Sequence, residues 1–279
     1  EGFAGISQET RLLFRGLRKI QSVEVEGMLQ TSNRFLARGT SLRPGLSGLF
    51  GGSLSQPKRY KRFSNVIVSM TERPYDSLLD IIIDWLKKRS EQAALQASVM
   101  TGLGKIKLSR FESESFQDFT WRTLFAKTLP ASDFSLVAPA NHLVCSVPWN
   151  TLHKVGLASL NWRATPKYPE LDTAGIDIFI GQTPYPARIS RGTAMVIRYH
   201  DALPVFMPHT IPNKSEHQSS HFYALMNNVK CGAWFACVSE ATRQDLIKLF
   251  PEAKDKAVTI HNMVSHNYFI EELAFERVL

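Results

Sequence analysis

The chain has 279 residues, of which 44% are hydrophobic and 21% are charged. These values are typical of a globular protein and exclude wholesale disorder. The net charge of +8 favours partners that carry phosphate, and no run of 18 apolar residues is present that would span a bilayer.

The cysteines and the opening residues indicate the cellular setting. Cys145, Cys231 and Cys237 contain no CxxC pair, which argues against a disulfide framework or a zinc site and fits a reducing compartment. Residues 1–5 do not resemble a signal peptide, so we expect a cytoplasmic protein whose chain begins here inside a structural element.

Two basic clusters account for part of the positive charge. They are Lys58-Arg59-Tyr60-Lys61-Arg62 and Lys87-Lys88-Arg89. Such clusters either attract phosphate groups or form an ordinary solvated face. The charge also permits nucleic-acid binding, but no recognised binding motif supports it.

The first half of the chain predicts two helices and a strand. Residues 1–20 read as a glycine-containing loop that enters a helix, with Ser7 or Thr10 as the cap, and residues 21–32 alternate as a strand does. Residues 38–57 are rich in Gly, Ser and Pro and predict a loop. Residues 74–100 predict one long helix with these side chains facing inward: Leu78, Leu79, Ile82, Trp85 and Leu86.

The second half predicts a regular alternation of strands and helices, after an ambiguous stretch over residues 101–130. The expected strands cover residues 143–147, 176–180, 194–199, 233–238 and 257–260, and the expected helices cover residues 149–157, 217–230 and 242–250. Short apolar strands that alternate with helices indicate an α/β fold with a Rossmann-like parallel sheet covered on both faces.

Ligands of such sheets bind at the carboxyl ends of the strands. The polar residues at those ends are Gln182, His200, Asp201, Ser239, Glu240 and Asn262. We therefore expect these residues, which are far apart in the sequence, to share one edge of the sheet.

Three segments carry a resemblance to a known family. They are Val196-Ile197-Arg198-Tyr199-His200-Asp201-Ala202-Leu203-Pro204, Cys237-Val238-Ser239-Glu240-Ala241-Thr242-Arg243-Gln244-Asp245-Leu246 and Val258-Thr259-Ile260-His261-Asn262. In this order and spacing they resemble landmarks of glycosyltransferase family 4, and Gly2 to Leu17 resembles that family's first glycine loop and helix. Here an apolar pair and Pro204 follow His200-Asp201. This form of the motif is similar to that of bacterial mannosyltransferase-like members.

The resemblance implies a GT-B fold, in which two Rossmann-like lobes face each other across a cleft. It further implies a retaining glycosyltransferase of surface polysaccharide synthesis that needs no cofactor and no metal. Its donor would be a nucleotide sugar, with GDP-mannose as the candidate, and its acceptor a saccharide or a lipid-linked saccharide. Residues 1–264 would form the N-terminal, acceptor-side domain, and residues 265–279 a linker or the start of a C-terminal donor-binding domain.

The resemblance also assigns roles to individual residues. His200 and Asp201 would be catalytic, with a neutral His200 imidazole that stabilises charge at the breaking glycosidic bond. Asp201 would either orient His200 or bond a nearby backbone N–H. The residues expected to bind the donor are Gly2, Gly5, Arg198 and Ser239, and those expected to bind the acceptor are Glu240 and Arg243.

Several of these residues and segments also have a purely structural interpretation. Ser239 can simply cap the helix that follows it, and the aromatic residues between 111 and 125 are either an acceptor platform or core. His217 and His221 have the spacing of helical metal ligands but lack the glutamate of the zinc-hydrolase motif. An alternative function for the chain is a non-catalytic module that docks on an anionic membrane surface or on an assembly partner through its basic clusters.

Overall fold

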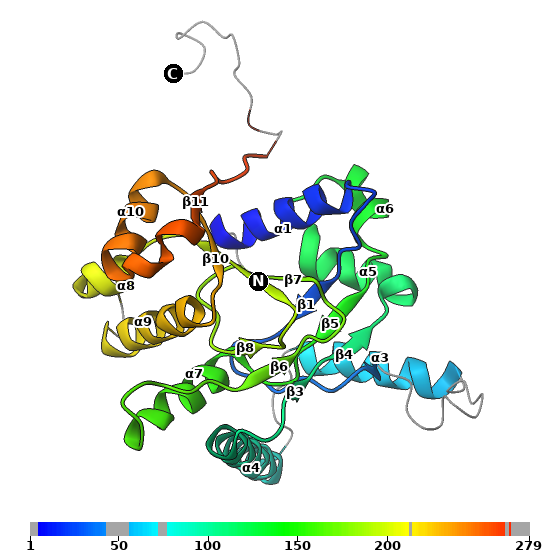
Figure 1. Ribbon diagram of the computed structural model, residues 1–279. Helices are drawn as coiled ribbons and strands as arrows, with labels where there is room; N and C mark the ends of the chain where they lie inside the picture. Colours follow the sequence, from blue (N-terminus) through cyan, green and yellow to red (C-terminus); the bar gives the residue numbers. More distant parts are fainter. Residues whose placement is uncertain (1–4, 43–55, 72–76, 212–213, 266–267, 269–279) are drawn as a thin grey trace, which may run out of the picture.

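We describe the fold from a computed structural model, in which residues 5–42, 56–71, 77–211, 214–265 and 268 are placed well enough to be described. Three small sheets and the helices around them form an α/β structure (Figure 1). The coarse fold class expected from the sequence, parallel strands flanked by helices, is therefore confirmed.

The strands fall into three sheets. The first has the order β11-β10-β9-β7 and is entirely parallel; the second, β1-β5-β4-β2, is mixed; the third, β3-β6-β8, is parallel. The strand bounds are β1 Gly27–Leu29, β2 Thr40–Ser41, β3 Ile106–Lys107, β4 Ser109–Phe111, β5 His142–Val144, β6 Glu170–Asp172, β7 Ile178–Gly181, β8 Arg188–Ile189, β9 Ala194–Tyr199, β10 Trp234–Cys237 and β11 Ala257–Thr259.

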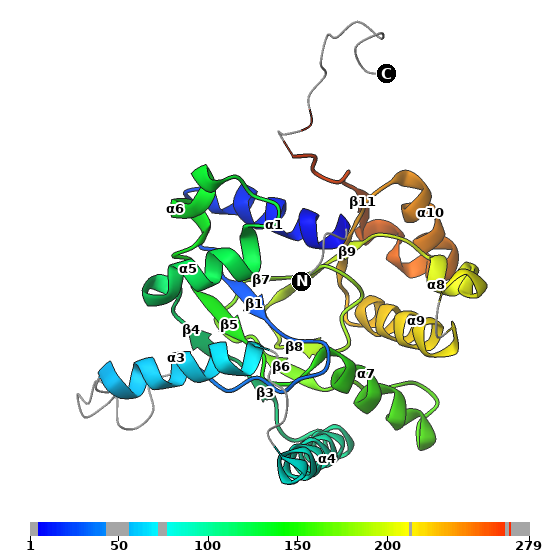
Figure 2. The ribbon, with the colours of Figure 1, turned by 180° about the vertical axis from the view of Figure 1, so that it is seen from behind.

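The helices surround these sheets on several sides (Figures 1 and 2). The α-helices are α1 Gly5–Arg18, α3 Gln56–Met70, α4 Leu78–Thr101, α5 Gln117–Thr120, α6 Phe134–Val137, α7 Trp149–Ala158, α8 Leu203–Phe206, α9 Lys214–Lys230 and α10 Glu240–Leu249. The 3₁₀-helices are η1 Ser113–Phe116, η3 Ala131–Asp133, η4 Ser159–Asn161, η5 Pro208–Thr210 and η6 Pro251–Lys256, and η2 Trp121–Phe125 is one turn of π-helix.

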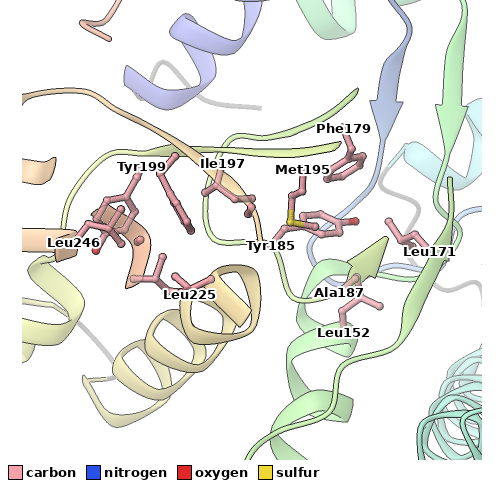
Figure 3. Close-up of a cluster of buried hydrophobic side chains, with 14 of the residues drawn as sticks. Leu152, Leu171, Phe179, Tyr185, Ala187, Met195, Ile197, Tyr199, Leu225 and Leu246 are labelled. Atoms are coloured by element: carbon pink, nitrogen blue, oxygen red, sulfur yellow. The ribbon is translucent and has the colours of Figure 1, made fainter. Parts of the chain in front are cut away.

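One face of the β11-β10-β9-β7 sheet forms the main core. Met195, Ile197 and Tyr199 alternate along β9 and pack with Leu225 of α9 and Leu246 of α10 (Figure 3). Side chains on the opposite face, such as Ile178 and Trp234, are exposed. Arg198, on the same opposite face of β9, is nevertheless buried against Glu9 of α1. Helices therefore lie on both faces of the sheet, but the second face is covered only in part.

The predicted strands and helices of the last third are confirmed to within two or three residues at each end. In the first half of the chain, the structure differs more from the predicted elements. The strand expected over residues 21–32 is confined to Gly27–Leu29, and the basic cluster Lys58–Arg62 lies on α3, a helix that the sequence analysis did not predict. Phe111 and Phe125 are buried, which supports their assignment to the core over an acceptor platform.

Two predicted segments fall mainly outside the described residues. Only residues 38–42, 56 and 57 of the loop expected over residues 38–57 are described, and they include β2 and the start of α3. Of the linker expected over residues 265–279, only residues 265 and 268 are described. Both expectations stay predictions.

The long helix α4 is present, but its predicted orientation is wrong. The side chains expected to face inward are all exposed: Leu78, Leu79, Ile82, Trp85 and Leu86. Helical periodicity shows which residues share a side of a helix, but it does not show whether that side faces the protein. Ser77 caps the helix through its hydroxyl, which accepts from Asp80 N, and Pro74 lies outside the described residues.

Gly156 of α7 lies directly against the fully buried ring of Tyr168, where an added methyl group would collide with the ring. We expect Gly156→Ala to lower the free energy of unfolding by about 2 kcal/mol, because overpacking a core forces backbone shifts. Gly16→Ala in α1 is the matched control: a methyl group added there would have only Met263 Sδ near it, at 3.9 Å. It should stabilise by about 0.5–1 kcal/mol. Urea unfolding of both variants tests this, and a stabilising Gly156→Ala would contradict it.

Candidate functional site at the carboxyl edge of the sheet

A buried charge cluster joins α1 to the carboxyl end of β9. Glu9 of α1 accepts from Arg198 Nε at 2.6 Å, and its other carboxylate oxygen lies 3.5 Å from His200 Nε2. Glu9 and Arg198 are 4% and 5% exposed. A buried ion pair holds its geometry because each charge would be left uncompensated without the other.

Arg198 also binds the segment that follows β11. Its Nη1 donates to Ile260 O at 2.6 Å, and its Nη2 donates to His261 O and to Asn262 Oδ1. With Glu9 and Ala236 O, five acceptors surround the five N–H donors of the guanidinium. The predicted contact of Arg198 with a donor phosphate stays a prediction, and it requires one of these bonds to be exchanged.

His200 lies beside this ion pair as a largely buried imidazole. Burial lowers its pKa, and the positive charge of Arg198 lowers it further, although Glu9 acts in the opposite direction. His200 is therefore neutral at pH 7, which is the form that the predicted catalytic role requires.

Asp201, the residue predicted to assist His200, bonds the backbone instead. Its Oδ1 accepts from Leu203 N at 3.0 Å at the start of α8. Of the two roles considered for Asp201, this contact supports the backbone cap.

The carboxyl end of β10 lies next to that of β9, as the sequence predicted. Ser239 Oγ accepts from Thr242 N at 3.1 Å and so caps α10, while Thr242 Oγ1 donates to His200 O at 3.2 Å. Glu240 accepts from Thr259 Oγ1, and Arg243 donates to Ala257 O. All these contacts stabilise the start of α10, and the roles predicted for Ser239, Glu240 and Arg243 in ligand binding stay predictions.

The predicted glycine turn is only partly described. Gly2 lies outside the described residues, whereas Gly5 is exposed at the start of α1 with no atom within 4 Å of a built-on methyl group. Glu9 stands one turn further along the same helix and touches His200. The start of α1, His200 and Ser239 therefore share one rim of the molecule.

A pocket of about 340 Å³ opens at the same edge, between α7, α8, α9 and the loop after β7. Its lining is Trp149, Asn150, His153, Thr183, Pro184, Pro204, Glu216, His217, Ser220 and His221. Thr183 and Pro184 follow the end of β7, and Pro204 follows Asp201, so the pocket adjoins the carboxyl ends of β7 and β9.

Sequence reasoning did not assign Trp149 or His153 to a site. Trp149 contacts His153 and Tyr185 in edge-to-face geometry, with ring centroids 5.3 and 5.2 Å apart. No local motif links α7 to α9, so only the tertiary fold brings His153 to His221. His217 and His221 both line the pocket, but no group of His, Cys, Asp and Glu among the described residues is arranged to hold a metal ion.

Two histidines of the pocket make stability depend on pH. Burial is the main cause that lowers the pKa of His153 and of His221 to about 4, against 6.5 for the ordinary value. Neighbouring histidines also lower both pKa values, whereas Asp201 acts to raise that of His221. Because the unfolded chain takes up these protons more readily, stability is complete above pH 6.5 and is lost as pH falls towards 4, by at most about 1.4 kcal/mol per unit for each histidine.

We expect His153→Phe to flatten this dependence by roughly 1.5 kcal/mol between pH 6.5 and 5. Urea unfolding of the wild-type and variant proteins across that range measures it. Parallel stability profiles would contradict the assignment of a depressed pKa to His153.

Comparison of the chain with family models, with curated proteins and with solved structures gives no match. No helix in the described part of the chain is both long and apolar enough to cross a bilayer. The function proposed below therefore rests on the resemblance of the sequence motifs and on the geometry of the site.

Proposed function

We propose that residues 1–264 form the acceptor-side, Rossmann-like lobe of a GT-B glycosyltransferase. In this proposal the enzyme transfers a sugar, with mannose from GDP-mannose as the first candidate, to a saccharide or lipid-linked acceptor of a surface polysaccharide, with retention of anomeric configuration. The observation that carries the proposal is the buried Glu9–Arg198–His200 cluster, which holds an imidazole at the carboxyl edge of a parallel sheet.

The chemistry would use this edge in the following way. The bond between the anomeric carbon and the phosphate oxygen breaks, the acceptor oxygen bonds to that carbon, and the acceptor proton passes to the departing diphosphate. His200 would hydrogen-bond the donor sugar as positive charge develops on it. The free N–H groups at the start of α1 would receive the diphosphate. In the proposal, a second lobe supplies the remaining contacts with the nucleotide.

We further propose the 340 Å³ pocket as an acceptor site, separate from Glu240 and Arg243, which do not line it. It combines an indole, Trp149, with hydrogen-bonding groups from Asn150, Glu216 and Ser220. Apolar rings together with a few placed polar groups are the usual composition of a small-molecule site. Neutral His153 and His221 can each donate one and accept one hydrogen bond, as sugar hydroxyls require.

Saccharide binding to the pocket tests the proposal. We expect saturable binding of at least one member of a panel of mono- and oligosaccharides, measured by saturation-transfer NMR. Ser220→Phe fills the pocket and should abolish this binding, whereas Ser215→Phe, an exposed position of α9 outside the pocket lining, should not. Binding that survives Ser220→Phe, or no binding across the panel, would contradict the assignment of the acceptor site.

The proposal places the protein in the cytoplasm, at the inner face of the membrane. Three unpaired cysteines, Cys145, Cys231 and Cys237, are consistent with a reducing compartment. Burial raises the pKa of Cys145 to about 12 and that of Cys237 to about 11, so neither thiol is a nucleophile at pH 7.

A further inference from the structure

The first half of α4 is exposed on all sides, and most of its exposed side chains are apolar. Leu79, Ile82 and Leu86, spaced to share one side of the helix, are 68%, 52% and 54% exposed. Leu95 and Val99 are half-buried and buried, and the helix contacts α7 and η4. In Figures 1 and 2, α4 lies at the lower edge of the molecule. An apolar face of this kind marks an interaction surface.

Two exposed tryptophans, one in α4 and one directly after η4, which contacts α4, each have an arginine over the ring. The Arg89 guanidinium lies 5.4 Å from the centroid of the exposed Trp85 ring within α4. Arg163 lies 5.7 Å from the ring of the exposed Trp162, directly after η4. Tryptophan is enriched at the boundary between lipid tails and headgroups, and arginine extends its charge from there into the headgroup layer.

Of α3 and α4, which both lie in the lower part of the molecule, α3 is the basic one. Within α4 the acidic and basic residues balance: Asp80, Asp84 and Glu91 against Lys87, Lys88 and Arg89. Helix α3 carries four basic residues and no acidic one, and their side chains are exposed: Lys58, Arg59, Lys61 and Arg62. Figures 1 and 2 place α3 and α4 in the same lower part of the molecule. Anionic headgroups attract such a basic segment.

We propose that α4 lies in the surface of an anionic bilayer, with Leu79, Ile82 and Leu86 in the outer part of the acyl layer. Trp85 and Trp162 then sit at headgroup level, and α3 lies against the anionic lipids. The proposal stands on these surfaces and does not depend on sugar transfer. A second copy of the chain is the other occupant that an apolar helix face would suit, and the experiment distinguishes it.

Co-sedimentation with vesicles tests the proposal. We expect the chain to bind vesicles of phosphatidylcholine with one quarter phosphatidylglycerol, and to bind pure phosphatidylcholine and high-salt samples much more weakly. The triple variant Leu79→Gln/Ile82→Gln/Leu86→Gln should lower the partition coefficient roughly tenfold or more, since it removes apolar surface that enters the lipid. Brominated lipids should quench tryptophan fluorescence, and Trp85→Phe should remove much of that quenching.

The matched control removes exposed apolar side chains of the β11-β10-β9-β7 sheet and the residue after it. Ile178→Thr/Val258→Thr/Ile260→Thr changes residues that are 58%, 47% and 52% exposed, and it should leave vesicle binding unchanged. Three results would overturn the proposal: no binding to anionic vesicles, equal loss of binding in both triple variants, or a dimer in light scattering that only the α4 variant dissociates.

Discussion

Replacing Arg198 with alanine is expected to lower the free energy of unfolding by about 3–5 kcal/mol. The substitution leaves the Glu9 carboxylate buried without its partner and removes donors from Ile260 O, His261 O and Asn262. Truncating one partner of a buried ion pair costs this much because the remaining charge stays uncompensated. Equilibrium unfolding in urea, followed by circular dichroism, measures the change.

Two further variants make this prediction falsifiable even if Arg198→Ala does not fold. Arg198→Lys keeps the charge but cannot reach the same acceptors, so we expect a smaller loss. Arg122→Ala removes an exposed ion pair with Asp118, in which the side chains are 75% and 71% exposed, and should change stability by less than about 0.5 kcal/mol. Equal effects of Arg198→Ala and Arg122→Ala would show that the cluster does not hold α1 against the sheet.

Replacing His200 with alanine is expected to lower kcat for sugar transfer by about 10²–10³, the range for loss of one preorganised hydrogen-bonding group in an active site. The melting temperature should change little, since the imidazole only approaches Glu9 at 3.5 Å. His200→Asn offers an uncharged amide donor and should restore part of the rate. Turnover assays with saturating donor and acceptor measure these effects.

The exposed His209 of η5 provides the matched control. His209→Ala should leave both kcat and KM at the wild-type values. If His200→Ala also retained wild-type turnover, the catalytic assignment would be wrong, whatever its effect on stability.

The sheet at the centre of the site was predictable because each of its strands is a short apolar run of consecutive residues. Residues 194–199 form a largely apolar run, and in the structure they form β9 with buried Met195 and Ile197. The polar residues that follow such strands therefore gather at one edge, as the sequence predicted for His200 and Ser239.

The partners of those residues were not predictable. No motif marks Glu9 within the first predicted helix, and the residue it binds lies 189 positions away. His153 lacks any motif that links it to His221. For helix α4 the sequence predicted the helix and its apolar residues but not whether those residues face the protein or the surroundings. That orientation depends on tertiary packing and on partners.

Sugar transfer with a defined stereochemical outcome is the decisive test of the proposed function. The protein that carries this chain would be incubated with labelled nucleotide sugars, GDP-mannose first, and with saccharide and lipid-linked acceptors, and the anomeric configuration of the product would be read by NMR. We expect a transferred sugar with the configuration of the donor and a loss of product with His200→Ala. Transfer with inverted configuration, or no transfer from any donor by a folded protein, would contradict the proposal.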